Sequence, residues 1–261
     1  MISMNVVWED TVAFLRREVA LVIPLALATS LVGDVVNTLV PPAAPGAQPN
    51  MLLSLLTFAG LLWTIVGQLA IIALVLRPGS SVGEAIALAV RRLPTLLGAA
   101  LLVGIGAALL LTPALIGFYT SGINVADPAT YARLPGWASL YFVVFACFAV
   151  WFSLRLSVLN ALVVDKQPGI ITAIRTAFAM TRGVISRLIL AALVYFIVLI
   201  VLTKVVQFVL GSAFQLLGRA MGSPFMADVL TALAIGVVTA ALSTFAAIFI
   251  AMLYRRLNTG T

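Results

Sequence analysis

Residues 79–83 match, by residue type and spacing, the G-x-S-x-G turn that presents the nucleophilic serine in many hydrolases. That turn follows a β-strand and its serine needs a histidine base, whereas this chain contains no histidine. Ser81 and Glu84 also have the spacing of a capping box, in which each side chain satisfies a backbone amide at the start of a helix. We therefore predict that Ser81 caps a helix and is not a nucleophile.

Metal and redox chemistry is limited by the same composition. Cys147 is the single cysteine, so a disulfide within the chain and a thiolate cluster are both excluded. Without histidine, no imidazole site can hold a metal. The eight acidic residues show no pairing that would place two carboxylates in one site. We therefore expect no catalytic residue, no metal and no cofactor, and a protein that is not an enzyme.

Polar side chains inside long apolar runs are the remaining candidates, because such groups are costly in a bilayer and by default suggest function. Five are singled out: Asp34, Gln68, Arg155, Asn160 and Lys204. Arg155 has a stem long enough to bring its charge to the cytoplasmic interface, and Asp165 or Glu84 are alternative partners for it.

Asp34 and Lys204 stand at comparable depths, each within about two helical turns of the outer surface. Three interpretations stay open for them: a structural ion pair between the first and fifth spans, exposure at the interface, or a conduction or substrate site. Gln207 lies on the same helix as Lys204, and Asp228 opens the last span.

The composition indicates which elements hold these polar residues in place. Hydrophobic residues make up 63% of the 261, charged residues only 9%, and the mean hydropathy is +1.22. A membrane-spanning helix needs about 20 apolar residues in sequence. The sequence therefore predicts an all-α, polytopic membrane protein with six transmembrane helices, over 19–40, 51–76, 94–117, 137–164, 184–211 and 225–253.

Basic residues are divided unequally between the two sides of these spans. The opposite loops hold only Arg133 and Arg219, whereas one side holds eleven of the fifteen: Arg16, Arg17, Arg77, Arg91, Arg92, Lys166, Arg175, Arg182, Arg187, Arg255 and Arg256. Because cytoplasmic loops are enriched in Lys and Arg, both termini are predicted to lie in the cytoplasm. The basic residues form no continuous tract, so we expect no nucleic-acid partner.

Three similar amphipathic segments precede predicted outward spans. Residues 83–92 and 171–178 match at an offset of 88, and residues 8–17 repeat the plan. Apolar residues recur in each at helical spacing, with charge on the other faces. We predict cytoplasmic amphipathic helices and, in a single membrane domain of residues 1–261, three parallel hairpin pseudo-repeats, about 1–77, 78–165 and 166–261. A short inner loop that is basic and amphipathic without repetition is the alternative.

Arginines on or beside these segments are expected to face lipid. They are Arg16, Arg17, Arg91, Arg92, Arg175, Arg182 and Arg187. Each basic side chain near an anionic membrane surface contributes about 1 kcal/mol, so the expected partner is anionic phospholipid.

Residues 153–195 contain three elements in sequence. They are an arginine within a span, a short acidic turn, and an amphipathic helix that ends in a Thr-Arg-Gly step. Here these elements are Arg155, Asp165, residues 173–178 and Thr181-Arg182-Gly183. The pattern resembles the bacterial membrane domain attached to some glycerophosphodiester phosphodiesterases, and related stand-alone membrane proteins. The resemblance implies a membrane domain without the catalytic barrel. Members often carry a proline near the position of Asn160, so the fourth span is expected to be straighter here.

These features favour a non-catalytic bacterial inner-membrane protein that interacts with lipid or organises the membrane. One alternative is a small-solute or lipid transporter or channel, for which the repeats and Asp34, Arg155 and Lys204 argue. The other is an accessory subunit of a larger complex with membrane-protein partners.

Overall fold

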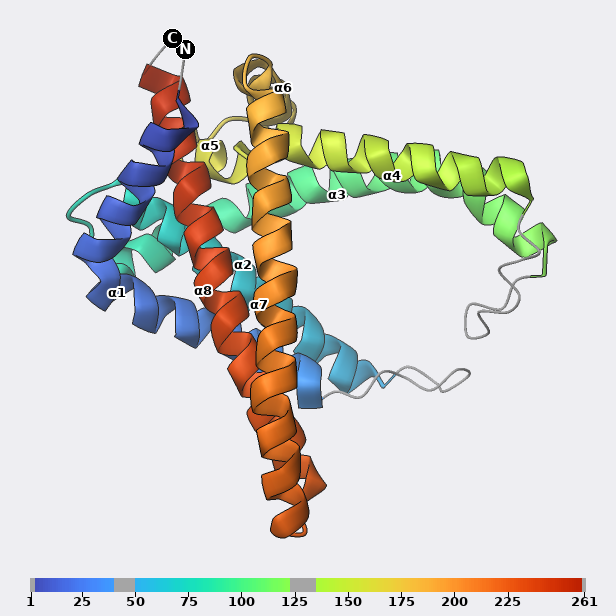
Figure 1. Ribbon diagram of the computed structural model, residues 1–261. Helices are drawn as coiled ribbons and strands as arrows, with labels where there is room; N and C mark the ends of the chain where they lie inside the picture. The colour runs from blue at the N-terminus through green and yellow to red at the C-terminus, as the bar shows by residue number, and fades with distance from the viewer. Residues whose placement is uncertain (1–2, 40–49, 123–134, 260–261) are drawn as a thin grey trace.

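The computed structural model describes residues 3–39, 50–122 and 135–259, except for the side chains of 32–39 and 224. In these ranges every regular element is a helix and no strand occurs, which confirms the all-α prediction for the described residues (Figure 1). The helices are α1 (Met4–Leu39), α2 (Met51–Leu76), α3 (Val82–Thr120), α4 (Gly136–Leu156), α5 (Leu159–Lys166), α6 (Ile170–Thr181), α7 (Ile185–Ala220) and α8 (Pro224–Thr259).

Five helical segments of the described chain are long and apolar enough to cross a membrane. They are α2, α3, the joined segment Gly136–Lys166, α7 and α8. Such segments fit a membrane-embedded protein, because a helix satisfies its own backbone hydrogen bonds in the absence of water. The first predicted span, 19–40, extends into side chains outside the described residues, so the sixth span stays a prediction.

The amphipathic segments join the spans in different ways. Residues 83–92 form the first turns of α3, which continues through Pro94, so one unbroken helix contains both the amphipathic segment and the predicted span. Proline removes one backbone hydrogen bond but keeps a helical φ, and here it does not end the helix. α1 bends at Glu18, whose φ of −107° and ψ of 16° leave the helical region. α6 stands apart from α7 because a turn at 182–184, which contains Gly183, separates them.

The fourth predicted span is interrupted rather than straight. α4 ends at Leu156 and α5 begins at Leu159. At the junction the Ser157 amide donates to the carbonyl of Leu154, three residues back, at 3.3 Å. Apart from Asn160, the residues from 158 to 164 are buried, whereas α4 is largely exposed. The expectation of a straighter span is therefore wrong: packing of the buried α5 segment sets the break, and no proline is needed for it.

Buried side chains gather at one end of the molecule, in residues 4–26, 65–99, 154–188 and 247–257, which we call the hub. Residues 69–75 of α2 and 251–254 of α8 are buried without interruption, so these helices are surrounded on all sides there. Three hairpins, α1–α2, α3–α4 and α7–α8, extend from the hub. Figure 1 shows α3–α4 running to the right and α7–α8 running downward.

A close crossing joins the two helices of each hairpin. A Cβ added to a helical glycine there would come within 3.0 Å of a side chain on the partner helix. The pairs are Gly67 with Thr29 (2.2 Å), Gly117 with Ala138 (3.0 Å) and Gly218 with Ala227 (2.7 Å). Small residues allow membrane helices to approach closely. The three crossings agree with hairpin-sized units, although the pseudo-repeats themselves stay a prediction.

Candidate functional site

Ser81 is the N-cap residue of α3. Its Oγ accepts a hydrogen bond from the amide of Glu84 at 3.2 Å, and the Ser81 amide donates to Glu84 Oε2 at 2.8 Å. The predicted capping box is therefore confirmed, and both side chains are engaged in starting the helix.

Arg155 packs across the end of α6. Its Nη1 donates to the carbonyl of Phe178 at 3.1 Å, and its guanidinium carbon lies 5.1 Å from the centre of the Trp151 ring and 5.8 Å from that of Phe178. The Phe178 carbonyl belongs to the last turn of α6, where carbonyls lack helical partners and carry partial negative charge. Arg155 thus fastens the end of α4 to α6, through a carbonyl and two aromatic faces.

The partners expected for Arg155 bind elsewhere in the described structure. Asp165 accepts a hydrogen bond from the Tyr254 hydroxyl at 2.7 Å, and Glu84 caps α3. Neither ion pair kept open for Arg155 forms among the described residues, where the guanidinium instead binds the Phe178 carbonyl at the end of α6. The buried Nε of Arg155 has no hydrogen-bond partner in the described structure.

The other polar residues predicted within the spans are spread over different helices. Gln68 is partly buried on α2, Asn160 is partly buried on α5, and Lys204 is exposed on α7. The side chain of Asp34 lies outside the described residues, so its pairing with Lys204 stays a prediction.

Six of the seven arginines predicted to face lipid are exposed at the hub: Arg16, Arg17, Arg91, Arg175, Arg182 and Arg187. Arg92 differs, because its side chain is buried with only 9% exposed. It falls on the same stripe of α3 as the buried Ala89 and Leu96, at helical spacing. The prediction that Arg92 faces lipid is therefore wrong, since this stripe packs against the hub.

The last turns of α8 form hydrogen bonds with two distant parts of the chain. Nη2 and Nε of Arg256 donate to Asp10 Oδ2 at 2.6 and 2.9 Å, and the Tyr254 hydroxyl donates to Asp165. The start of α1 and the end of α8 therefore lie side by side at the hub (Figure 1).

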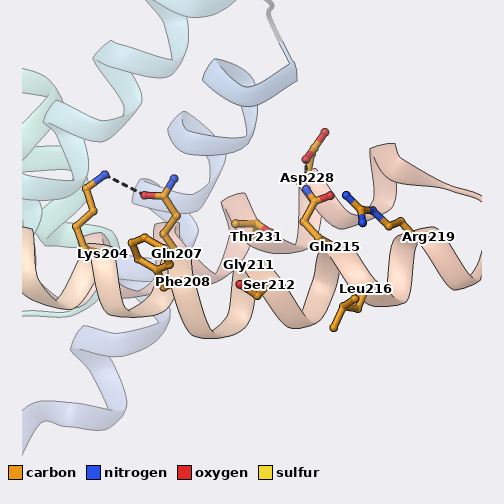
Figure 2. Close-up of a pocket in the computed structure, with 10 residues that line it drawn as sticks. All are labelled: Lys204, Gln207, Phe208, Gly211, Ser212, Gln215, Leu216, Arg219, Asp228 and Thr231. Atoms are coloured by element: carbon orange, nitrogen blue, oxygen red, sulfur yellow. Dashed lines mark hydrogen bonds between the residues drawn. The ribbon is translucent and has the colours of Figure 1, made fainter.

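A polar cleft of about 680 Å³ lies between α7 and α8, in the half of the hairpin away from the hub (Figure 2). It is lined by Lys204, Gln207, Phe208, Gly211, Ser212, Gln215, Leu216, Arg219, Asp228 and Thr231. Lys204 Nζ donates to Gln207 Oε1 at 3.2 Å, and Gln215 Nε2 donates to Asp228 Oδ1 at 2.9 Å. We call this site the α7–α8 cleft.

The polar lining follows from the spacing of residues on α7. Positions 204, 207, 211, 215 and 219 recur every three or four residues and therefore share one face of the helix. Figure 2 shows Lys204, Gln207, Gln215 and Arg219 projecting toward the same side. Sequence reasoning recognised Lys204, Gln207 and Asp228 singly but missed that Gln215 and Arg219 continue the same face. The spacing within the apolar run is the signal that would have found them.

Acidic and cysteine side chains do not gather in threes anywhere in the described ranges, so no metal-binding group is found there. The polar residues that the structure brings together are those of the α7–α8 cleft and of the contacts at the hub. No family model, curated protein or solved structure matches the chain.

Proposed function

We propose that this chain is a non-catalytic bacterial inner-membrane protein that binds anionic phospholipid of the cytoplasmic leaflet through its hub. The observation that supports this function is the charge of the hub. The hub ranges contain twelve of the fifteen Lys and Arg residues and five of the eight Asp and Glu residues. Their excess of basic residues therefore equals the whole net charge of +7.

The exposed arginines of the hub stand beside exposed apolar side chains. On α6, Ile171 is 67% exposed and lies one helical turn before the exposed Arg175. On α1, Trp8 is 53% exposed in the amphipathic segment that leads to Arg16. An apolar side chain next to a cation suits the boundary between acyl chains and headgroups, where each contacts its own part of a lipid.

The electrostatic part of this binding is large enough to measure. At about 1 kcal/mol for each basic side chain near an anionic surface, three of the exposed arginines supply about 3 kcal/mol. Salt weakens this term because the Debye length falls to about 3 Å at 1 M.

The test is the thermal stability of the purified protein in nanodiscs of phosphatidylcholine alone and of phosphatidylcholine with phosphatidylglycerol. We expect a higher Tm with the anionic lipid, because a ligand that binds the folded state raises its stability, and a smaller shift at high salt. Equal Tm values in the two lipid compositions would contradict the proposal.

A charge-neutral and a charge-preserving variant identify the surface involved. Replacing Arg91, Arg175 and Arg182 together by Gln should remove most of the Tm shift that phosphatidylglycerol causes, and leave the Tm in phosphatidylcholine unchanged. Replacing the same three by Lys should keep the shift, because the positive charge is what the membrane surface attracts. Loss of the shift in both variants would mean that arginine geometry, and not charge, binds the lipid.

A second candidate, an accessory subunit, is favoured by α3. Gly104 and Gly106 are exposed in its half away from the hub, and the space that a Cβ would occupy at each is open. Small residues on a lipid-facing surface are typical of contacts between membrane helices. Native mass spectrometry in mild detergent decides: a stoichiometric second protein supports a subunit, and retained phospholipid without a protein supports the first proposal.

A further inference from the structure

The α7–α8 cleft is separate from the hub and is not used by the function proposed above. Lys204 is the single charged residue between Arg187 and Arg219 on α7. At a rise of 1.5 Å per residue, it lies roughly 25 Å from Arg187 and roughly 22 Å from Arg219 along the helix axis. If these two arginines mark the membrane surfaces, Lys204 lies near the centre of the bilayer. This is deeper than the roughly two turns from the outer surface that the predicted span 184–211 implied, because α7 continues to Ala220.

The partner helix gives the same depth independently. α8 is uncharged between Asp228 and Arg255. The contact between Gly211 and Thr231 sets the antiparallel register of the hairpin. With this register, the midpoint of the uncharged stretch of α8 lies opposite about residue 200 of α7, roughly one turn from Lys204. Both helices therefore place Lys204 close to the middle of the apolar zone, where a cation is costly unless it has a counter-charge or water.

Lys204 forms no ion pair among the described side chains. Its hydrogen-bond acceptor is the amide oxygen of Gln207. The carboxylate that lines the cleft, Asp228, is bound to Gln215 and lies about three turns nearer the outer end. With Lys204 and Arg219 against Asp228, the lining carries one excess positive charge. The charge of the lining is thus complementary to a ligand with one negative charge.

The shape of the cleft indicates where that ligand comes from. Its polar face runs from Lys204 to Arg219, at the outer end of the hairpin, and Phe208 and Leu216 form apolar walls that are 73% and 67% exposed. A polar floor with apolar walls open to the side accommodates a headgroup in the cleft and acyl chains outside it. The volume of about 680 Å³ lies within the range of small-ligand sites, and Ser212 and the glutamines add neutral hydrogen-bonding groups.

We propose that the α7–α8 cleft binds the phosphodiester group of a phospholipid from the outer leaflet. Lys204 binds the phosphate at depth, Arg219 guides it at the entrance, and the acyl chains stay against Phe208 and Leu216. The cleft would thus hold a lipid headgroup deeper in the membrane than its own leaflet places it.

The test uses the full chain carrying Gln at Arg91, Arg175 and Arg182, so that lipid binding at the hub does not obscure the cleft. Native mass spectrometry of this parent, titrated with phosphatidylglycerol in mild detergent, gives the dissociation constant of the first bound lipid. Lys204→Met should weaken it at least tenfold, whereas Lys204→Arg should stay within about twofold, because a charge-assisted hydrogen bond to phosphate is retained. Unchanged affinity in Lys204→Met would overturn the proposal.

Two further measurements separate the competing explanations. Glycerol phosphate in millimolar excess should not displace the lipid, and displacement would assign the cleft to a soluble phosphate compound instead. The Tm of Lys204→Met should equal or exceed that of the parent, because removing a deep charge relieves an unfavourable group. A lower Tm that Asp34→Asn reproduces, with lipid affinity unchanged, would make Lys204 part of a structural ion pair and refute the lipid site.

Discussion

Gly67→Ala should loosen the α1–α2 hairpin, because the new methyl carbon would lie 2.2 Å from Thr29 Oγ1 and 2.3 Å from Thr29 Cβ. The Thr29 side chain cannot turn away freely, since its hydroxyl donates to the Leu25 carbonyl at 2.8 Å. The two helices must therefore separate by roughly an ångström to restore ordinary van der Waals contact.

The magnitude of this destabilisation follows from the neighbouring contacts. Overpacking a tight site costs about 1–3 kcal/mol. Separation also stretches the hydrogen bond from Trp63 Nε1 to the Ala28 carbonyl, now 3.1 Å, and interhelical bonds in membranes contribute about 0.6 kcal/mol each. We expect a total loss of about 2–3 kcal/mol.

Chemical unfolding of the purified protein in mixed micelles measures this loss, with Gly104→Ala as the matched control. Gly104 is also a helical glycine, but a Cβ there meets no atom within 4 Å. Its replacement should be neutral or slightly stabilising, by up to about 1 kcal/mol, because alanine is the better helix former. If the two variants unfold alike, the crossing at Gly67 is not as close as described and the reasoning fails.

Three other substitutions test contacts of the hub and of α3. Tyr254→Phe should cost about 1 kcal/mol in unfolding free energy, because it removes the hydrogen bond to Asp165 and keeps the ring; no change would show that the bond is not formed. Arg256→Ala should cost less than about 1 kcal/mol, since the Arg256 and Asp10 side chains are 45% and 32% exposed, and high salt should shrink the difference from wild type. Ser81→Ala should cost about 1 kcal/mol and increase hydrogen exchange in the first turn of α3, whereas exchange at Asn50, which caps α2, should stay as it is.

The structural features that the sequence predicted correctly depend on residues that lie close together in the chain. The Ser81–Glu84 capping box and the long apolar helices α2, α3, α7 and α8 follow from spacing and composition alone. Both rest on interactions within a few turns of one helix, which a single sequence displays directly.

Contacts between distant residues escaped prediction. The partner of Arg155 is a backbone carbonyl at Phe178, and no side-chain pattern marks a carbonyl as a partner. The burial of Arg92 depends on which side of α3 meets the hub, and the charge of the residue suggested the opposite. The interruption at Ser157 depends on how α5 packs, so the missing proline was an unreliable guide.

The contacts that the end of α8 makes with earlier parts of the chain also have a consequence for how the protein is synthesised. Asp10 and Arg256 are separated by 246 residues, and Asp165 and Tyr254 by 89. At roughly 5–20 residues per second of synthesis, Asp10 waits about 12–50 s for its partner. The earlier hairpins must therefore enter the membrane and remain there before α8 is available to pack against their hub surfaces. Synthesis of α8, rather than insertion of any earlier hairpin, sets the moment at which the hub can close.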